Sequence, residues 1–565
     1  MVSSYSSSDS VTDRLHRPLD QTLSGGNDLN GDEAHKSSYQ HNGTDRLVGL
    51  WTEQTNLKRE MFSTSGQYPG FDRFGRTVSQ SWKNRSSGAV LDQVDYKYDY
   101  AGNRLTRDLP SGLYATNDRD QKYTYDNLHR LTNAQQGTLS SGSITSRNFE
   151  QDWTLDQLGN WPTFKERDTD SGGTWDLNQS RAHNSVNEID VDNDHTNSPG
   201  ASITASPGAN WIDPKYDAAG NMIEAPKPGA ETTKHKYIYD AWNRLVKVTD
   251  ASNVTIVTME YDGLGQRIQK VVAGGATHDY YYNEQWQLLT EALGGSTYAT
   301  YFWHPHYVDA LAVRFRSGES HTFLQDGNFN VTAAVDGWAS SGDYRDVVER
   351  YAYSPYGEVI FLEDDFDVAA TQESAIDNTH LYTGREQDLE TGLQLNRNRY
   401  YAPHLGRWVN RDPIEYEGSP WNLYEYVSGN PVVFSDPSGR IFCCTRYRQR
   451  WKVRGYASPA DCVLACTGQF YGTVTGWGSV VGGIAAIKYP ITSPVLAPIA
   501  TGLGTYSLNL AHGCDISCRT YECVRMEDVP GIDIGFGDAC RVCPEATYDP
   551  PRNPVPPFDP GLNMF

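Results

Sequence analysis

The sequence predicts a mainly β fold in which tandem hairpins form one long, curling sheet. Two observations carry this prediction. First, between about residues 47 and 360 the chain repeats one phrase, an aromatic or apolar residue followed by Asp and then by Gly or Asn. The intervals are roughly 22 to 30 residues, except for one of 61 that fits two units with one degraded. Second, strand-like runs rich in tyrosine, of which the chain has 36, precede these phrases. A single hairpin cannot bury a face alone, so neighbouring hairpins must pair into a continuing sheet.

The first segment, residues 1–46, has a composition that favours disorder. It is rich in Ser, Asp, Asn and Gly and has few large apolar residues, so we expect a disordered N-terminal arm. Its start lacks the basic residues and apolar run of a secretory signal. A truncated gene model, export without a signal and retention inside the cell all remain open, and the expected location is the cell surface or the exterior.

Residues 47–380 are expected to form the hairpin shell. In a representative unit, the aromatic run Tyr237 to Tyr239 leads into Asp240 and Asn243, which favour a tight turn with a left-handed residue. The repeated aspartates should therefore cap backbone amides. Stacking of the aromatic rings on glycans is the alternative, and it ranks lower because aromatic pairs across strands explain the same residues. The aspartates of the clear units are Asp72, Asp99, Asp126, Asp156, Asp217, Asp240 and Asp262.

Residues 381–440 alternate short apolar runs with turn-forming residues, and they carry a family resemblance. The segment resembles the core associated with rearrangement-hotspot (RHS) repeats, and the upstream phrases resemble the tyrosine-aspartate (YD) repeats of RHS proteins, bacterial wall-associated proteins and the teneurin shell. This resemblance implies a hollow β-shell with the RHS core closing one end. The submotifs that carry it are Gly392-Leu393, Arg399-Tyr400-Tyr401, Gly406-Arg407-Trp408, Arg411-Asp412-Pro413-Ile414, Asn422-Leu423-Tyr424, Asn430-Pro431 and Asp436-Pro437-Ser438-Gly439.

The resemblance also implies a self-cleaving site. In RHS and toxin-complex shells the core acts as an aspartyl autoprotease, which on this sequence would pair Asp412 with Asp436, place Arg411 beside them and cut between Arg440 and Ile441. Paired carboxylates can divide the roles of general base and general acid. Three features depart from the family pattern: Glu415 replaces the glycine of the first Asp-Pro-x-Gly phrase, the gap between the phrases is longer, and Arg occupies the cut position. The structural alternative makes both aspartates turn residues only.

The tail, residues 441–565, is expected to be a variable cysteine-rich module with a proline-rich end. Cys462 and Cys466, and likewise Cys514 and Cys518, are spaced to share one helical face, so we expect an α-helical hairpin closed by two disulfides, with a four-cysteine zinc site as the alternative. Two uncharged stretches between these pairs favour a buried hairpin over membrane insertion, because Gly, Ser, Thr and Pro dilute them. All nine cysteines lie in the tail: Cys443, Cys444, Cys462, Cys466, Cys514, Cys518, Cys523, Cys540 and Cys543.

Charge and motifs together lead to two functional hypotheses. A formal net charge of −23 argues against nucleic-acid binding by the whole chain. The first hypothesis is a non-enzymatic shell protein, acting as a surface or secreted scaffold, that carries the variable tail. The alternative is a polymorphic toxin whose core cuts after Arg440 and releases a membrane-active effector. No cofactor or metal is expected. The expected partners are the chain's own tail, enclosed by or docked on the shell, then cell-surface glycans or proteins, and a membrane for the tail.

Overall fold

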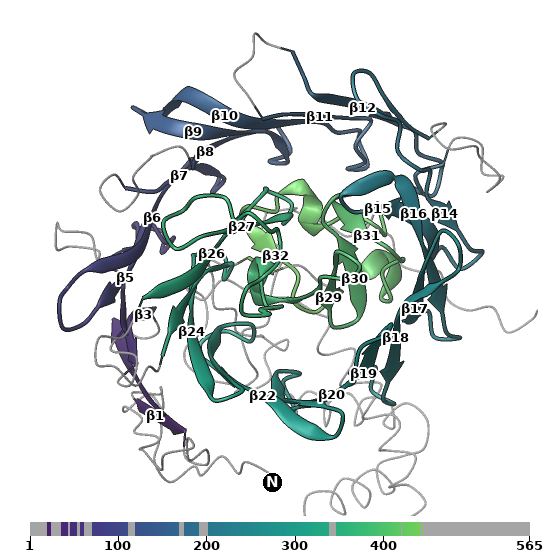
Figure 1. Cartoon of the computed structure of the whole chain (residues 1–565). Coiled ribbons are helices and arrows are strands. Elements are labelled where there is room, and N and C mark those ends of the chain that lie inside the picture. Colours follow the sequence, from purple (N-terminus) through teal and green to yellow (C-terminus); the bar gives the residue numbers. More distant parts are fainter. Residues whose placement is uncertain are drawn as a thin grey trace, which may run out of the picture.

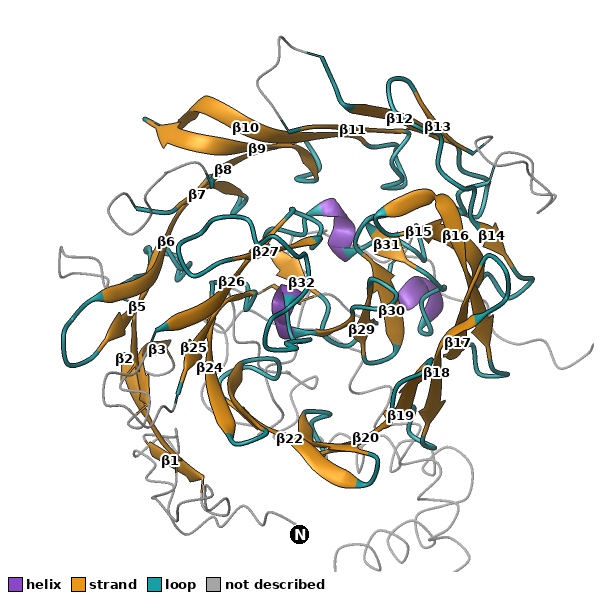
Figure 2. Ribbon diagram, viewed as in Figure 1, coloured by secondary structure: helices purple, strands orange, loops and turns teal. Residues whose placement is uncertain are grey.

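The structure is a computed structural model that describes residues 20–23, 35–42, 46–52, 57–61, 70–110, 119–168, 174–190, 202–337, 346–419, 421–440 and 443–444. These residues form antiparallel strands and three short 3-10 helices. Two long sheets curve around a small central core, which confirms the predicted β-shell (Figures 1 and 2).

The first sheet contains thirteen strands, each paired with its neighbour in the sequence. In order they are β1 (Asp20–Leu23), β2 (His35–Asn42), β3 (Arg46–Thr52), β4 (Leu57–Glu60), β5 (Ser79–Asn84), β6 (Val90–Tyr98), β7 (Arg104–Asp108), β8 (Asp120–Tyr125), β9 (Leu131–Ser140), β10 (Ser143–Thr154), β11 (Thr163–Arg167), β12 (Leu177–Arg181) and β13 (Ile203–Ala205). Strands β1 and β2 lie inside the segment that was expected to be disordered. That expectation is wrong for these residues, because β2 pairs with β3 and buries Ser38 and Tyr39 despite its polar composition.

The second sheet contains fourteen strands, again in sequence order. They are β14 (Lys215–Tyr216), β15 (Met222–Lys227), β16 (Ala230–Tyr239), β17 (Leu245–Asp250), β18 (Thr255–Tyr261), β19 (Arg267–Val272), β20 (Thr277–Tyr282), β21 (Leu288–Leu293), β22 (Ser296–Trp303), β23 (Leu311–Arg316), β24 (Glu319–Gln325), β25 (Val331–Asp336), β26 (Val347–Tyr353) and β27 (Val359–Leu362).

The two sheets overlap as the chain spirals inward. In Figure 1, β24, β26 and β27 lie inside β3 to β7, and side chains of the two layers pack together. Leu50 and Trp82 of the outer layer share one apolar cluster with Leu324, Ala333 and Val335 of the inner layer. Strands in this overlap are covered on both faces, so β25 is buried along almost its whole length.

The repeated aspartates form the turns at one rim of the shell. Asp240 is representative: its Oδ1 accepts hydrogen bonds from the backbone N–H groups of Trp242 (2.9 Å) and Arg244 (3.0 Å). The Arg244 side chain pairs with the same carboxylate and donates from Nη1 to the backbone oxygen of Asp262 in the next unit, 2.9 Å away. Each aspartate therefore holds its own turn. In most units the side chain four residues later, an arginine as at Asp240 or an asparagine as at Asp217, binds the same carboxylate and contacts the next turn.

The tyrosines of the repeat connect successive units. The hydroxyl of Tyr261 donates to the backbone oxygen of Leu245 at 2.6 Å, and Tyr239 donates in the same way to Met222 at 2.9 Å. Each of these hydroxyls binds a backbone carbonyl of the preceding hairpin, so the repeated Tyr-Asp pair stabilises both the turn and the stacking of units. The same bond is made by Tyr125, Tyr282 and Tyr353.

The core closes the rim that carries the Tyr-Asp turns. It contains η1 (Tyr382–Gly384), β28 (Glu386–Asp388), β29 (Leu393–Asn396), β30 (Arg399–Ala402), β31 (Arg407–Trp408), η2 (Glu415–Glu417), η3 (Val427–Gly429) and β32 (Phe434–Ser435). Strand β33 (Cys443–Cys444), at the start of the tail, pairs with β32. Asn422 donates to the backbone oxygen of Leu158 (3.0 Å), and Asn430 donates to that of His129 (2.9 Å). Because alternate turns of an antiparallel meander lie at one edge, a few core side chains contact turns from widely separated units.

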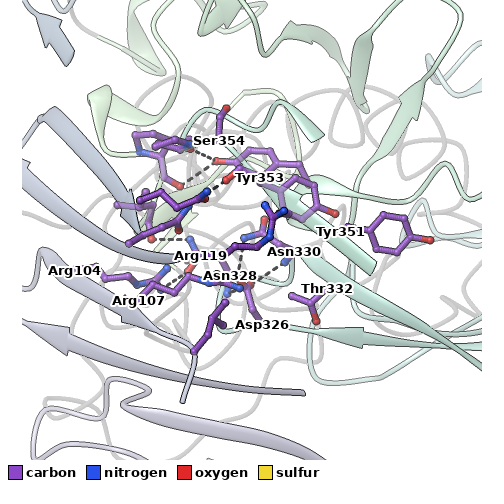
Figure 3. Close-up of a pocket in the computed structure, with 18 of the residues that line it drawn as sticks. Arg104, Arg107, Arg119, Asp326, Asn328, Asn330, Thr332, Tyr351, Tyr353 and Ser354 are labelled. Atoms are coloured by element: carbon purple, nitrogen blue, oxygen red, sulfur yellow. Dashed lines mark hydrogen bonds between the residues drawn. The ribbon is translucent and has the colours of Figure 1, made fainter. Parts of the chain in front are cut away.

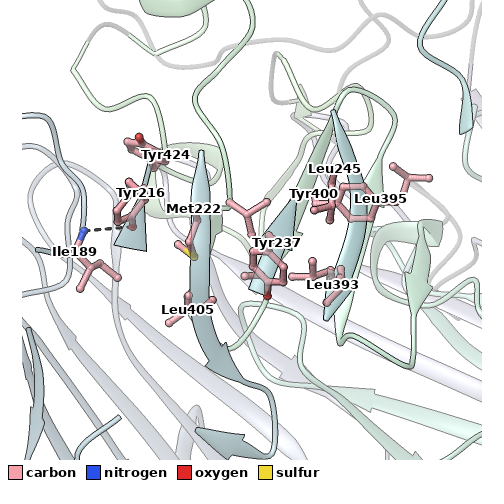
Figure 4. Packing of buried hydrophobic residues seen from close by; sticks show 14 of the residues in the cluster. Ile189, Tyr216, Met222, Tyr237, Leu245, Leu393, Leu395, Tyr400, Leu405 and Tyr424 are labelled. Carbon is pink, nitrogen blue, oxygen red and sulfur yellow. Dashed lines mark hydrogen bonds between the residues drawn. The ribbon is translucent and has the colours of Figure 1, made fainter. Parts of the chain in front are cut away.

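Apolar packing and a buried ionic cluster fix the core against the second sheet. Met222 and Tyr237 of the sheet share a cluster with Leu393 and Leu405 of the core (Figure 4). Nearby, the fully buried Arg267 contacts Asp388 at 2.6 Å and also pairs with Glu386. Removing one member of such a cluster would leave an unpaired buried charge, which costs about 3–5 kcal/mol.

Candidate functional site

Four consecutive core residues bind the Asp-Pro-Ser-Gly turn through its backbone. Asn396 to Arg399 donate from their side chains to the carbonyl oxygens of residues 436–439, one after another. The Asn396 amide reaches Asp436 at 2.6 Å, and the Asn398 amide reaches Ser438 at 2.9 Å. We call residues 396–399 the carbonyl clamp. The next carbonyl along the chain belongs to Arg440, at the bond that the family resemblance implies is cut.

The two aspartates of the implied site lie on either side of one arginine. Arg399 Nη2 is 2.9 Å from Asp412 Oδ2 and 3.4 Å from Asp436 Oδ2. All three side chains are almost fully buried, and the guanidinium lies 4.1 Å from the centre of the Trp408 ring. The structure thus brings Asp412 and Asp436 together, and the shared cation compensates a part of their mutual repulsion.

Asp436 also contacts the peptide that precedes the implied cut. Its Oδ1 accepts hydrogen bonds from the N–H groups of Gly439 (2.9 Å) and Arg440 (3.3 Å) and from the Ser438 hydroxyl (2.9 Å). This carboxylate is therefore both a turn cap and a direct neighbour of Arg440. The structural role considered in the sequence analysis is real, and it does not exclude a chemical one.

The two Asp-Pro turns have similar backbone geometry in spite of the Glu415 substitution. Gly439 ends the second turn at φ +66°, and Glu415 ends the first at φ +53°. In both turns the aspartate Oδ1 accepts the N–H group two residues later, from Ile414 at 3.0 Å and from Ser438 at 3.2 Å. A glutamate therefore adopts a conformation that favours glycine, and the position of Asp412 is preserved.

Burial makes both carboxyls weaker acids than usual. Removal from water raises the pKa of Asp412 to about 6, with a further contribution from Asp436, while Arg399 and the Ile414 N–H group oppose the rise. Burial likewise raises the pKa of Asp436, against the effect of Arg399 and the turn hydrogen bonds. A carboxyl with a pKa of about 6 can carry a proton at mildly acidic pH, which a general acid requires.

Arg411 lies away from the carboxylate pair beside which the family resemblance placed it. Its Nε is 3.2 Å from the Tyr424 hydroxyl, and its Nη2 is 3.1 Å from Glu188, at the rim of the shell. The cation beside the carboxylates is Arg399, which sequence analysis did not select. A signal was present, because Asn396 to Arg399 alternate amide and guanidinium side chains immediately before the tyrosine pair.

Several expectations fall outside the described residues. Ile441 and the four disulfide candidates Cys462, Cys466, Cys514 and Cys518 are among them. Within the ranges described above, no helix has the length and hydropathy needed to cross a membrane. The same ranges contain no group of three or more His, Cys, Asp or Glu residues placed to hold a metal ion.

A separate polar pocket lies between the overlapping sheets, and it is a weaker candidate (Figure 3). Its volume is about 50 Å³, enough for only a few water molecules. Arg104 donates to Asn328 at 2.7 Å, and Asp326 accepts the backbone N–H groups of Asn328 and Asn330. These mutual contacts explain the pocket as a polar junction of the two layers.

Comparison with known proteins connects this architecture to RHS proteins and toxins. The RHS Repeat family model matches residues 239–277. The tRNA3(Ser)-specific nuclease WapA of Bacillus spizizenii is 27% identical over 246 residues, which cover 42% of this chain and 10% of that protein. Toxin subunit YenC2 of Yersinia entomophaga is 23% identical over 441 residues, covering 70% of this chain and 39% of the relative. Toxin protein Tse5 of Pseudomonas aeruginosa is 24% identical over 460 residues, which cover 76% of this chain and 29% of that protein.

A solved structure supports the fold assignment. The Photorhabdus luminescens Tc holotoxin pore matches with a TM-score of 0.52 and 18% sequence identity, over 76% of this chain and 21% of that one. At this identity the likeness concerns the fold alone. Together with the family model, it confirms the resemblance to RHS shells that the sequence motifs indicated.

The comparisons correct the first functional hypothesis. The chain spans between 10% and 39% of the length of these three relatives, which are a nuclease, a toxin subunit and a toxin protein. A non-enzymatic scaffold was therefore the wrong main hypothesis, and the polymorphic-toxin alternative fits the relatives better. The error has a physical source: the repeats dominate the sequence, and a stable β-shell is equally suited to adhesion and to carrying a toxin.

Proposed function

We propose that this chain, which is an RHS-repeat protein, is a polymorphic toxin whose core cuts after Arg440 and frees residues 441–565 as an effector held by the shell. One observation carries the proposal. The carbonyl clamp holds the turn of residues 436–439 so that the Arg440 peptide lies against the paired carboxylates of Asp412 and Asp436. Toxins among the relatives support the same assignment.

The reaction is hydrolysis of the Arg440–Ile441 peptide bond. Asp436, as the carboxylate, takes a proton from a water molecule as the water oxygen bonds to the Arg440 carbonyl carbon. Asp412, as the protonated acid, donates to the carbonyl oxygen. When the tetrahedral intermediate collapses, the C–N bond breaks, its electron pair goes to the Ile441 nitrogen, and that nitrogen takes the proton held by Asp436. Asp412 takes back the proton from the former carbonyl oxygen, so both carboxyls return to their starting states. The products are a carboxyl group on Arg440 and an amine on Ile441.

Backbone hydrogen bonds give the two aspartates different roles in this scheme. Asp436 Oδ1 accepts the N–H groups of Ser438, Gly439 and Arg440, whereas Asp412 Oδ1 accepts that of Ile414. Backbone N–H donors favour an ionised carboxylate. Asp436 is therefore the better base and Asp412, with a pKa raised to about 6, is the better acid.

The effector is proposed to act on membranes after delivery outside the producing cell. Two uncharged stretches in the tail, residues 464–487 and 489–512, have the length of membrane helices. His512 is the tail's lone histidine, which argues against a catalytic site that needs several histidines. The shell's proposed partner is accordingly its own tail until release.

A leakage assay tests the effector half of this proposal. Residues 441–565 would be expressed in a bacterial host with and without an export signal, and entry of a membrane-impermeant dye would be recorded alongside growth. We expect dye entry and growth arrest with the free tail, and neither with the full chain carrying Asp412→Asn. Normal growth and intact membranes with both forms of the tail would contradict a membrane-active effector.

A further inference from the structure

Gly418 lies at the point where the reacting groups of the proposed cleavage meet. A methyl group added to its Cα would lie 2.5 Å from Asp412 Oδ2 and 2.7 Å from the carbonyl oxygen of Arg440. Both distances are far shorter than a carbon–oxygen contact allows, so the bare glycine leaves room for both oxygens. The Asp412 carboxyl and the Arg440 carbonyl that it would protonate therefore lie close together beside Gly418.

The backbone at Gly418 does not itself require glycine. Its φ of −82° and ψ of −42° are ordinary helical values that any residue can adopt. Alanine would thus introduce a steric contact without backbone strain. The requirement for glycine arises from the space between Asp412 and Arg440.

Asp412 has little freedom to move away. Asp412 is 4% exposed and its Oδ2 contacts Arg399 at 2.9 Å. The Arg440 carbonyl follows directly after the four carbonyls that the clamp holds. An added methyl group would have to separate these two oxygens or displace Asp412 Oδ2 from Arg399.

Gly418 also accounts for a departure from the family pattern. Glu415 occupies the place of the glycine in the first Asp-Pro-x-Gly phrase, and η2 (Glu415–Glu417) follows it. This single helical turn places Gly418 over Asp412. A side chain at position 415 is tolerated because the position that must lack one comes three residues later.

We propose that Gly418 is a positioning residue for self-cleavage, and that its missing side chain leaves open the contact between the Asp412 carboxyl and the Arg440 carbonyl. This inference rests on the proposed function. The geometry makes cleavage sensitive to a single methyl group at this position, and it makes the ionisation of Asp412 sensitive as well, because that methyl group would exclude water from the carboxyl.

The test compares Gly418→Ala with Gly263→Ala in the full-length chain. Gly263 is a matched control, since it has no left-handed φ and an added methyl group meets nothing within 4 Å. Cleavage would be followed by intact-mass spectrometry at pH values on both sides of the Asp412 pKa. We expect Gly418→Ala to cleave about a hundredfold more slowly, as misplacement of reacting groups by about 1 Å does. Its residual activity should extend to higher pH, while Gly263→Ala should match the wild type.

The outcomes separate this inference from the function on which it rests. A wild-type chain that stays intact overturns the proposed function, and the inference with it. A wild-type chain that cleaves, with Gly418→Ala cleaving equally fast, overturns the inference alone. Folding is checked by thermal melting of Gly418→Ala in the non-cleaving Asp436→Asn background. If the melting temperature is unchanged, the slower cleavage of Gly418→Ala is due to the site and not to a folding defect. If the variant is unfolded, Gly418 has a role in the fold and the inference is overturned.

Discussion

The buried Asp412 carboxyl should make the folded protein less stable as the pH rises. Its pKa is raised from 3.8 in water to about 6 in the folded state, so between these values the folded chain binds the proton more tightly than the unfolded chain. Stability therefore falls with rising pH over this window, and the loss is complete above pH 6. The shift corresponds to about 3 kcal/mol of unfolding free energy.

The effect is isolated by a pair of variants that cannot cleave. Asp436→Asn is compared with Asp436→Asn plus Asp412→Asn, and urea unfolding is measured from about pH 4 to about pH 7. Burial is the largest cause of the shift, so it persists without the Asp436 charge. Other titrating groups affect both proteins equally and cancel in the difference.

We expect the protein that retains Asp412 to lose up to about 3 kcal/mol relative to its partner as the pH rises through the window. If the unfolding free energies of the two proteins change with pH in the same way, the reasoning is refuted. A difference of the opposite sign would show that pairing with Arg399 outweighs burial and that Asp412 is a poor candidate for the acid.

Three further predictions concern the turn, the cut and the repeats. Glu415→Gly should raise the unfolding free energy by about 1 kcal/mol in thermal melts, because it removes a left-handed glutamate, and cleavage should continue; destabilisation would contradict the turn geometry. Arg440→Leu should still be cut after residue 440, because the Arg440 side chain is exposed and the carbonyl clamp binds backbone atoms. Mass spectrometry would show the fragments, and an uncut variant would mean that the site recognises the arginine side chain. Tyr261→Phe should cost about 1 kcal/mol through its lost bond to Leu245, whereas Phe at the exposed Tyr281 should cost little; equal effects would contradict the inter-repeat role.

Local chemistry made much of the fold predictable. Asp240 and Asn243 have clear turn preferences, and their repetition around the chain is enough to infer stacked hairpins. The inward spiral was not predictable in the same way. It depends on contacts such as Trp82 with Leu324, which join residues far apart in the sequence and leave no periodic signal.

Only the pairing of the two aspartates, which lie in the family motifs, was predictable from the sequence. Asp412 and Asp436 followed from the family phrases, and so did the position of Arg411 beside them, which the structure does not show. Neighbouring residues in an extended or turning segment direct their side chains apart, and Arg411 accordingly reaches Glu188. Arg399, the cation that contacts both carboxylates, adjoins neither of them in the sequence and was named only as part of the family phrase Arg399-Tyr400-Tyr401.

An intact-mass spectrum of freshly purified full-length protein, measured together with Asp412→Asn and Asp436→Asn variants, tests self-cleavage most directly. The account predicts two fragments from the wild type, one ending at Arg440 and one beginning at Ile441, and a single full-length mass from each variant. A single full-length mass from all three proteins would contradict the account and leave Asp412 and Asp436 with a purely structural role.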